Sequence, residues 1–167
     1  MNPFRWPFRL QFAAGFIVCV ALLGYAHYEQ FVEGIEPCPM CIFQRIAMEV
    51  MGLFFLLGAL HNPRERGRKA YALLILLGAC AGVAIAARHL WVQHQPPDPM
   101  AGCAPGWNYM VENFPLSKAL KMAFTGHADC AQITWTLFGL SMPFWTLVCY
   151  VLLGAGALWA GFRRRTN

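Results

Sequence analysis

The stretch YALLILLGACAGVAIAARHLWV, residues 71–92, decides the fold class, because it carries no charged side chain before Arg88. As an α-helix, its 22 residues rise ~33 Å at ~1.5 Å each, enough to cross a membrane hydrocarbon core of ~30 Å. Apolar runs inside soluble domains are usually shorter than this. The stretch therefore predicts a transmembrane helix.

Three further blocks, 10–28, 42–60 and 142–162, are apolar over similar lengths. The composition agrees with them, because 58% of the 167 residues are hydrophobic and 13% are charged, whereas soluble domains carry about 25% charged residues. We predict an all-α membrane protein, an antiparallel four-transmembrane-helix bundle that forms one integral membrane domain over residues 1–167.

The first block could be a signal peptide, since Arg5 and Arg9 precede its apolar run. That run is longer than a usual signal core, and residues such as Tyr25 and Glu29 follow it in place of a small-residue cleavage site. We expect it to be retained as the first transmembrane helix.

The formal net charge of +5 would suit a nucleic-acid-binding protein, but membrane topology explains where the basic residues lie. Nine of the 13 Lys and Arg residues fall in three short segments: Arg5 and Arg9; Arg64, Arg66, Arg68 and Lys69; and Arg163, Arg164 and Arg165. The positive-inside rule then places both termini and the loop 61–70 in the cytoplasm. The loops 29–41 and 93–141 face outward, and no nucleic-acid partner is expected.

The long outer loop, 93–141, begins with the stretch QPPDP at 95–99, which cannot be helical. Further on, residues 115–124 place apolar side chains at helical spacing: Leu116, Ala119, Leu120 and Ala123. This spacing predicts a short amphipathic helix that lies in the headgroup plane of the bilayer.

The seven cysteines divide by location. Cys19, Cys80 and Cys149 lie within the predicted helices, where a thiol behaves as a small apolar side chain. The other four lie on the outer face: Cys38, Cys41, Cys103 and Cys130. An even number of cysteines on the side where disulfides persist predicts disulfide chemistry.

The Cys38-Pro39-Met40-Cys41 pair opens the second helix, and its spacing suits zinc, haem or redox chemistry. Haem attachment would need a histidine where Ile42 stands. A zinc site would need two more ligands, which Cys103 and Cys130 could supply. We favour the redox interpretation, because the first turn of a helix stabilises a Cys41 thiolate. We therefore expect no bound metal.

Polar groups converge just below this cysteine pair. Arg45 lies one helical turn deeper, where an ionisable side chain marks a functional site by default, although snorkelling to the headgroups is an alternative. Glu49 is its expected ion-pair partner. The third helix brings Arg88 and His89 to a similar depth. The electron acceptor must take two electrons from a dithiol, reach the site from within the membrane and offer oxygen atoms to these donors. A quinone meets these requirements.

At this point the residues resemble a known family, the disulfide bond formation protein B (DsbB) family. The resemblance rests on four helices, the Cys-x-x-Cys that opens the second helix, Arg45 four residues later, and a second cysteine pair in the long outer loop. It also rests on CAQITWTLFGLSMPFW, residues 130–145, with its Gly-Leu-x-Met-Pro-x-Trp run. It covers essentially the whole chain.

The resemblance implies a role for each cysteine. Cys103 would form the mixed disulfide with a DsbA-like protein, and Cys130 would be its partner in the loop. Cys38 would exchange with that loop pair, and Cys41 would make the charge-transfer contact with the quinone.

The resemblance also implies a quinone site, for ubiquinone or menaquinone. Arg45 matches the family's quinone-site arginine, His89 is similar to a histidine near the quinone, and Trp135 would shield the same region. The protein would be an enzyme, a protein-dithiol:quinone oxidoreductase of the bacterial inner membrane, with a periplasmic DsbA-like partner and periplasmic redox cysteines.

Two departures from the family's pattern concern the quinone pocket: Gln44 stands where some members are acidic, and Glu49 where an apolar residue is expected. A thiol-based heavy-metal carrier is the main alternative function, and a scaffold with static loop disulfides is another. Bundles of the vitamin K epoxide reductase type would carry the Cys-x-x-Cys late in the chain, whereas here it comes early.

Overall fold

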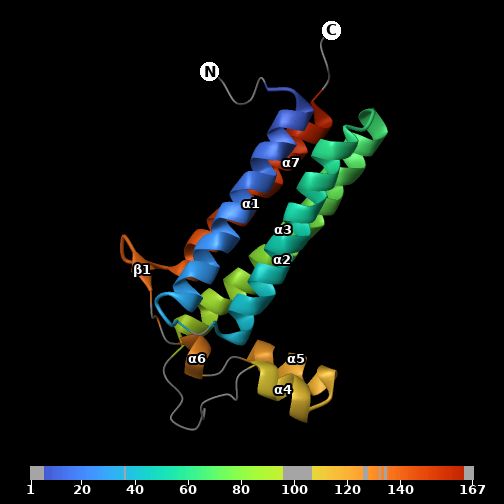
Figure 1. Cartoon of the computed structure of the whole chain (residues 1–167). Helices are drawn as coiled ribbons and strands as arrows, with labels where there is room; N and C mark the ends of the chain where they lie inside the picture. The colour runs from blue at the N-terminus through green and yellow to red at the C-terminus, as the bar shows by residue number, and fades with distance from the viewer. Residues whose placement is uncertain are drawn as a thin grey trace.

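The computed structural model describes residues 6–35, 37–95, 107–125, 128–131, 133 and 135–163. Its four long helices are α1 (Phe8–Phe31), α2 (Pro39–His61), α3 (Glu65–Gln93) and α7 (Met142–Phe162). Each is long and apolar enough to cross a membrane, which confirms the predicted four-helix membrane fold. The start of α1, the turn between α2 and α3, and the end of α7 lie at one end of the bundle (Figure 1).

Three helices begin earlier than the apolar blocks suggested: α1 by two residues, α2 by three and α3 by six. Helix α2 begins at Pro39, with Cys38 as the N-cap residue. Proline suits the first turn of a helix, because the backbone N–H that it lacks has no helical partner there. The predicted cytoplasmic loop 61–70 is mostly helix, since α3 begins at Glu65, which pairs with Lys69 at 2.7 Å. Hydropathy could not show this extra turn, because its residues are charged and its helix is stabilised by i,i+4 contacts.

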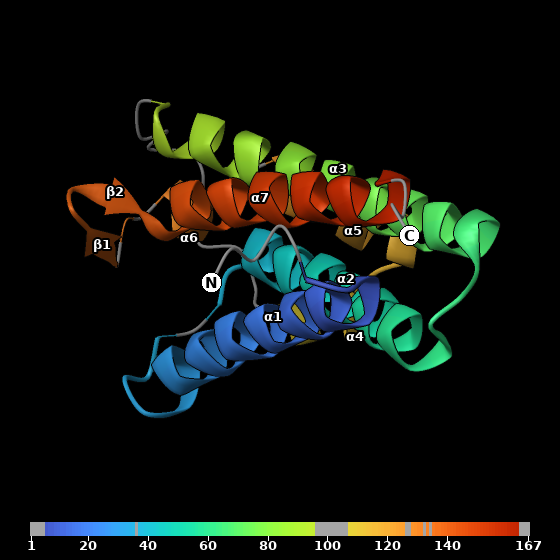
Figure 2. The same cartoon turned by 90° about the horizontal axis from the view of Figure 1, so that it is seen from above.

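Helices α3 and α7 approach each other closely through small residues. A Cβ atom added to Gly82 would lie 2.4 Å from Cε1 of Tyr150, and one on Gly161 would lie 2.5 Å from Cβ of Ala72. Lipid gives apolar helices little reason to associate, so close van der Waals packing of small residues holds such pairs together. Seen along the bundle, α3 and α7 form one half and α1 and α2 the other (Figure 2).

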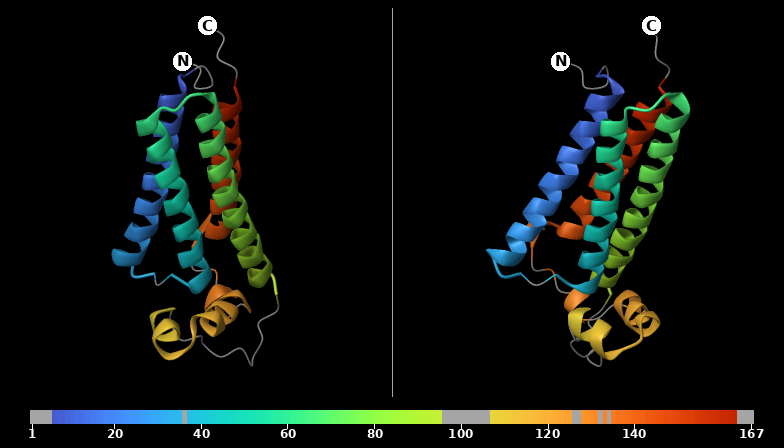
Figure 3. Two further views of the ribbon diagram at one scale, coloured as in Figure 1. Left: turned by 90° about the vertical axis from the view of Figure 1, so that its right-hand side faces the viewer. Right: turned by 45° about the vertical axis from the view of Figure 1, so that its right-hand side comes forward.

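The remaining elements gather at the end of the bundle away from the α2–α3 turn (Figure 3). They are the helices α4 (Trp107–Asn113), α5 (Leu116–Thr125) and α6 (Ala128–Ala131) and the antiparallel strands β1 (Thr136–Leu137) and β2 (Leu140–Ser141). The predicted short helix at 115–124 is α5. Its Phe124 ring stacks on Phe43 of α2, with 5.3 Å between the centroids.

The sequence pattern predicts neither α4, nor α6, nor the hairpin. The β1–β2 turn has positive φ at both central residues, 53° at Phe138 and 77° at Gly139, as a type I′ turn requires. Phe138 at such a position is uncommon, so the turn carried no strong signal. The stretch QPPDP, at 95–99, lies outside the described residues beyond Gln95.

Candidate functional site

The cysteine pair lies at the mouth of the bundle, at the first turn of α2. Cys38 precedes the helix as its N-cap residue and Cys41 falls within the first turn, so the two Sγ atoms are 3.0 Å apart. Both thiols are partly buried and line a pocket between the helices. The free backbone N–H groups and the positive end of the helix macrodipole at this turn favour a thiolate at Cys41.

A third cysteine from a distant part of the chain joins this pair. Cys130 lies on α6 with 0% of its surface exposed, and it packs in a small cluster with Met40 and Val92. Its Sγ, the Cys38 Sγ and a ring nitrogen of His89 all lie within 4.8 Å of one another. The short helix α6 thus brings a thiol from the outer loop within reach of the Cys-x-x-Cys pair.

The Cys130 thiol holds its proton in this arrangement. The hydrogen bond that it donates to Cys38, followed by burial, raises the pKa of Cys130 above the ordinary thiol value, and a hydrogen bond from the Met40 N–H opposes this only in part. A thiolate with a high pKa is intrinsically more nucleophilic and is a poorer leaving group. Cys130 therefore suits the attacking side of an exchange with Cys38.

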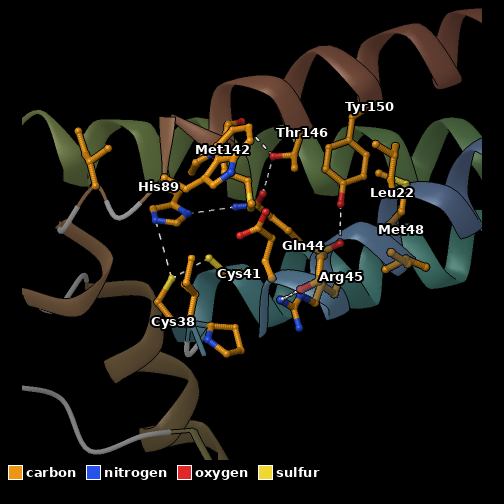
Figure 4. Close-up of a pocket in the computed structure, with 18 of the residues that line it drawn as sticks. Leu22, Cys38, Cys41, Gln44, Arg45, Met48, His89, Met142, Thr146 and Tyr150 are labelled. Carbon is orange, nitrogen blue, oxygen red and sulfur yellow. Dashed lines mark hydrogen bonds between the residues drawn. The ribbon is translucent and has the colours of Figure 1, made fainter. Parts of the chain in front are cut away.

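His89 reaches the cysteines from α3. It is buried, with 3% of its surface exposed, and its Nε2 lies 3.8 Å from the Cys38 Sγ and 3.2 Å from the carbonyl oxygen of Cys130. Figure 4 shows the imidazole between the cysteine pair and the side chain of Gln44. One ring nitrogen therefore faces sulfur and the other faces an amide.

Gln44 connects three helices and orients this imidazole. Thr146 on α7 donates a hydrogen bond to the Gln44 Oε1 at 2.6 Å, and the Gln44 Nε2 lies 3.2 Å from the His89 Nδ1. The amide nitrogen then donates to Nδ1, so the proton of neutral His89 resides on Nε2, facing Cys38 and the Cys130 carbonyl. Tyr150 donates to the backbone carbonyl of Gln44 and fixes the same residue from α7.

Arg45 turns toward α1. Its Nη2 donates to the carbonyl oxygen of Ala26 at 2.8 Å and its Nη1 donates to the side chain of Gln30. The expected ion pair with Glu49 is wrong: among the described residues, Arg45 makes no such contact, and Glu49 is exposed. Arg45 and Glu49 are neighbours on the helix surface, but the bonds of Arg45 to Ala26 and Gln30 turn its guanidinium toward α1 and away from the exposed Glu49.

The pocket has a volume of about 140 Å³ and is lined by all four long helices. An apolar cavity of ~150 Å³ holds one benzene-sized ring. Leu22, Met48 and Met142 supply apolar surface, and Arg45 supplies a cation. Trp135 also lines the pocket, and its ring lies 6.1 Å from that of Tyr25.

A quinone ring fits these residues. It needs apolar walls and hydrogen-bond donors for its oxygen atoms. The Arg45 guanidinium has five N–H donors, of which two make the bonds to α1, and His89 lines the same pocket. The thiol of Cys41 faces this pocket as well.

The structure brings together six of the seven residues that the sequence suggested: Cys38, Cys41, Cys130, Arg45, His89 and Trp135. Cys103 lies outside the described residues. Sequence reasoning missed Gln44 as a connecting residue, and it missed Thr146 and Tyr150 altogether. The available signal was a pair of hydroxyl side chains four residues apart in the otherwise apolar α7.

Comparisons with known proteins agree on one family. The family model described as Disulfide bond formation protein DsbB matches residues 8–160. The chain is 50% identical over 168 residues to Disulfide bond formation protein B of Xanthomonas euvesicatoria pv. vesicatoria, covering 100% of this chain and 98% of that protein. It is 45% identical to the protein of that name from Nitrosococcus oceani, over 93% of this chain and 89% of the relative.

The Gln44 contacts predict the tautomer of His89. Solution NMR of the detergent-solubilised protein with ¹⁵N-labelled histidine should show the His89 proton on Nε2. His27 is the internal control, because its Nδ1 lies 2.8 Å from the carbonyl oxygen of Leu23 and must donate the proton there. A proton on Nδ1 of His89 would contradict the assignment and would mean that the Gln44 amide is reversed.

Proposed function

The chain belongs to the DsbB family of disulfide bond formation proteins, and from this premise we propose that it oxidises the dithiol of a soluble DsbA-like protein and passes both electrons to a membrane quinone. One observation carries the proposal: Cys130 of the outer loop lies beside Cys38 of the Cys-x-x-Cys pair, at the mouth of a ring-sized pocket. In the proposed path, the loop pair, the Cys-x-x-Cys pair and the acceptor site act in series.

The proposed exchange begins at the outer loop. A thiolate of the partner attacks Cys103 of a Cys103–Cys130 disulfide, a mixed disulfide forms, and Cys130 leaves as a thiolate. The partner's second thiol then resolves the mixed disulfide, so the partner is oxidised and the loop pair has gained two electrons. Cys130 leaves as a thiolate, although its raised pKa favours the protonated thiol at equilibrium. Until it takes up a proton, a thiolate of such high pKa is a strong nucleophile.

The second exchange passes these electrons inward. The Cys130 thiolate attacks Cys38, a Cys38–Cys130 disulfide forms, the Cys38–Cys41 bond breaks, and Cys41 leaves as a thiolate. Its place in the first turn of α2 stabilises that charge. Cys103 then attacks Cys130, the loop disulfide forms again, and Cys38 leaves as a thiolate, so that both electrons reside on the Cys38–Cys41 pair. His89, with Nε2 facing Cys38 and the loop, is placed to hold or give up a proton as the thiols change charge.

Thermodynamics requires a final acceptor. A DsbA-type disulfide has a potential of about −120 mV, whereas stable structural disulfides lie below about −300 mV, so a static loop disulfide would not reoxidise it. A quinone bound in the pocket would accept two electrons and two protons. Arg45 would donate to its oxygen atoms through the N–H groups that α1 does not use, His89 would line its site, the apolar side chains would hold its ring, and Trp135 would exclude water.

We propose the bacterial inner membrane as the location, with both termini in the cytoplasm. The basic residues at the start of α3 and the end of α7, among them Arg64, Arg66 and Arg163, lie at the end of the bundle opposite the cysteines. The positive-inside rule then places Cys38, Cys41 and Cys130 toward the periplasm. That compartment is where a soluble thiol oxidase would be met.

Cysteines inside the helices weigh against the heavy-metal carrier. Cys19 is buried against Gly52, and Cys80 is exposed on the side of α3. Neither of these nor Cys149 lines the pocket, so among the described residues the cysteines inside the helices do not extend the thiol pair at its mouth.

Coupled turnover tests the proposed function. Purified protein mixed with a reduced DsbA-like protein and a ubiquinone analogue should reduce one quinone for each dithiol oxidised. Cys41→Ser should abolish this coupling, whereas Cys80→Ser, a substitution away from the pocket, should leave it unchanged. Cys103→Ser should block oxidation of the partner and leave the Cys38–Cys41 pair oxidisable by quinone. Loss of thiols without loss of quinone would contradict the proposal.

Substitution of Arg45 tests the acceptor site. We expect Arg45→Ala to raise the KM for quinone about 10-fold or more, the equivalent of one hydrogen bond from a charged donor, at saturating partner protein. Arg66→Ala, an exposed arginine at the far end of the bundle, is the matched control. If KM does not change, Arg45 serves only to join α2 to α1.

A further inference from the structure

We propose that the fully reduced site is also a redox-gated zinc site, in which Cys38, Cys41, Cys130 and His89 hold one Zn²⁺. The proposal goes beyond the transfer of electrons, because it needs neither the partner protein nor the quinone. It rests on three ligand atoms within 4.8 Å of one another, from Cys38, His89 and Cys130, and on the Cys41 Sγ, which lies 3.0 Å from the Cys38 Sγ. All four are of the types that zinc prefers. Three thiolates and one imidazole form a common structural zinc set.

The distances are close to those of a tetrahedral site. With Zn–S near ~2.3 Å and Zn–N near ~2.0 Å, tetrahedral ligands stand ~3.8 Å apart for two sulfurs and ~3.5 Å apart for sulfur and nitrogen. The Cys38 Sγ is already 3.8 Å from the His89 Nε2 and 3.0 Å from the Cys41 Sγ. The Cys130 Sγ is within 4.8 Å of the first two. A side-chain rotation that brings the Cys41 Sγ toward the other three ligand atoms would complete the site.

The surrounding hydrogen bonds can follow the metal. Zinc on Nε2 requires the His89 proton on Nδ1, and Gln44 would accept it after reversal of its amide. Thr146 permits that reversal, because its Oγ1 lies 3.0 Å from the carbonyl oxygen of Pro143 and can donate there while it accepts from the Gln44 amide. A ligand histidine commonly donates its second N–H to such an acceptor. Metal binding should thus move the His89 proton from Nε2 to Nδ1.

Redox state controls whether the site exists. Each zinc displaces one proton from each of three thiols, whereas a Cys38–Cys41 disulfide has no thiolate to offer. The loop disulfide removes Cys130 in the same way. Zinc therefore binds only when both pairs are reduced, and it retains the thiols in a form that cannot enter exchange.

Metal titration of reduced, detergent-solubilised protein tests this inference directly. Competition with a chromophoric chelator should give one tight Zn²⁺ per chain, and Co²⁺ should give the visible absorption of a tetrahedral thiolate site. The disulfide form should give neither signal. Cys130→Ser should weaken zinc binding about 100-fold or more, because it removes one of the four ligands. Cys80→Ser, on the same helix as His89, should bind as the unsubstituted chain does.

Three results would overturn the assignment. Equal binding by Cys130→Ser would reduce the site to the Cys-x-x-Cys pair alone. If Cys103→Ser lost most of its zinc affinity while His89→Asn bound zinc normally, the fourth ligand would be Cys103 and not His89. A His89 proton that stays on Nε2 in the zinc-bound protein would remove the imidazole from the ligand set. Each readout is independent of turnover, so the failure of the proposed function would leave this test intact.

Discussion

The contact between α6 and the first turn of α2 is the constraint on which the site depends. It places the Cys130 Sγ within 4.8 Å of the Cys38 Sγ, although 91 positions separate the two residues in the chain. Burial of Cys130 with Met40 and Val92 holds the contact together. Without it, the thiols of the outer loop and of the helix pair would be too far apart for the exchange that we propose.

The membrane explains why this chemistry lies at a helix end. Inside the hydrocarbon every backbone N–H and C=O must be satisfied within the helix, so the interior offers no backbone donors to a reactive group. The first turn of α2 has N–H groups without helical partners, and Pro39 removes one that would be wasted. Gln44 then continues the polar site one turn deeper through bonds to His89 and Thr146, and through the bond that it accepts from Tyr150. A polar cluster is tolerated there because its members satisfy one another.

Much of this arrangement was readable from the sequence. Long apolar blocks predict transmembrane helices well, because a membrane span needs a minimum length whatever its neighbours are. The cysteine spacing and Arg45 indicated the site for similar local reasons. Contacts between distant residues were not readable: the turn of Arg45 toward Ala26, the orienting role of Gln44, and the hairpin at Phe138 all depend on tertiary packing. The expected Arg45–Glu49 pair failed because spacing along a helix does not say which neighbour a side chain will face.

The most direct test of the central claim is a disulfide map of the Cys41→Ser, Cys103→Ser double variant. With its two competing partners removed, Cys38 should pair with Cys130 under mild oxidation, and mass spectrometry of the digested protein should recover one cross-linked peptide that contains both. Such a cross-link at high yield in the monomer is the result that the account predicts. If Cys38 and Cys130 both remained free thiols, or paired only between molecules, the contact between the loop and α2 would not exist in the membrane protein, and the proposed path of electrons would be wrong.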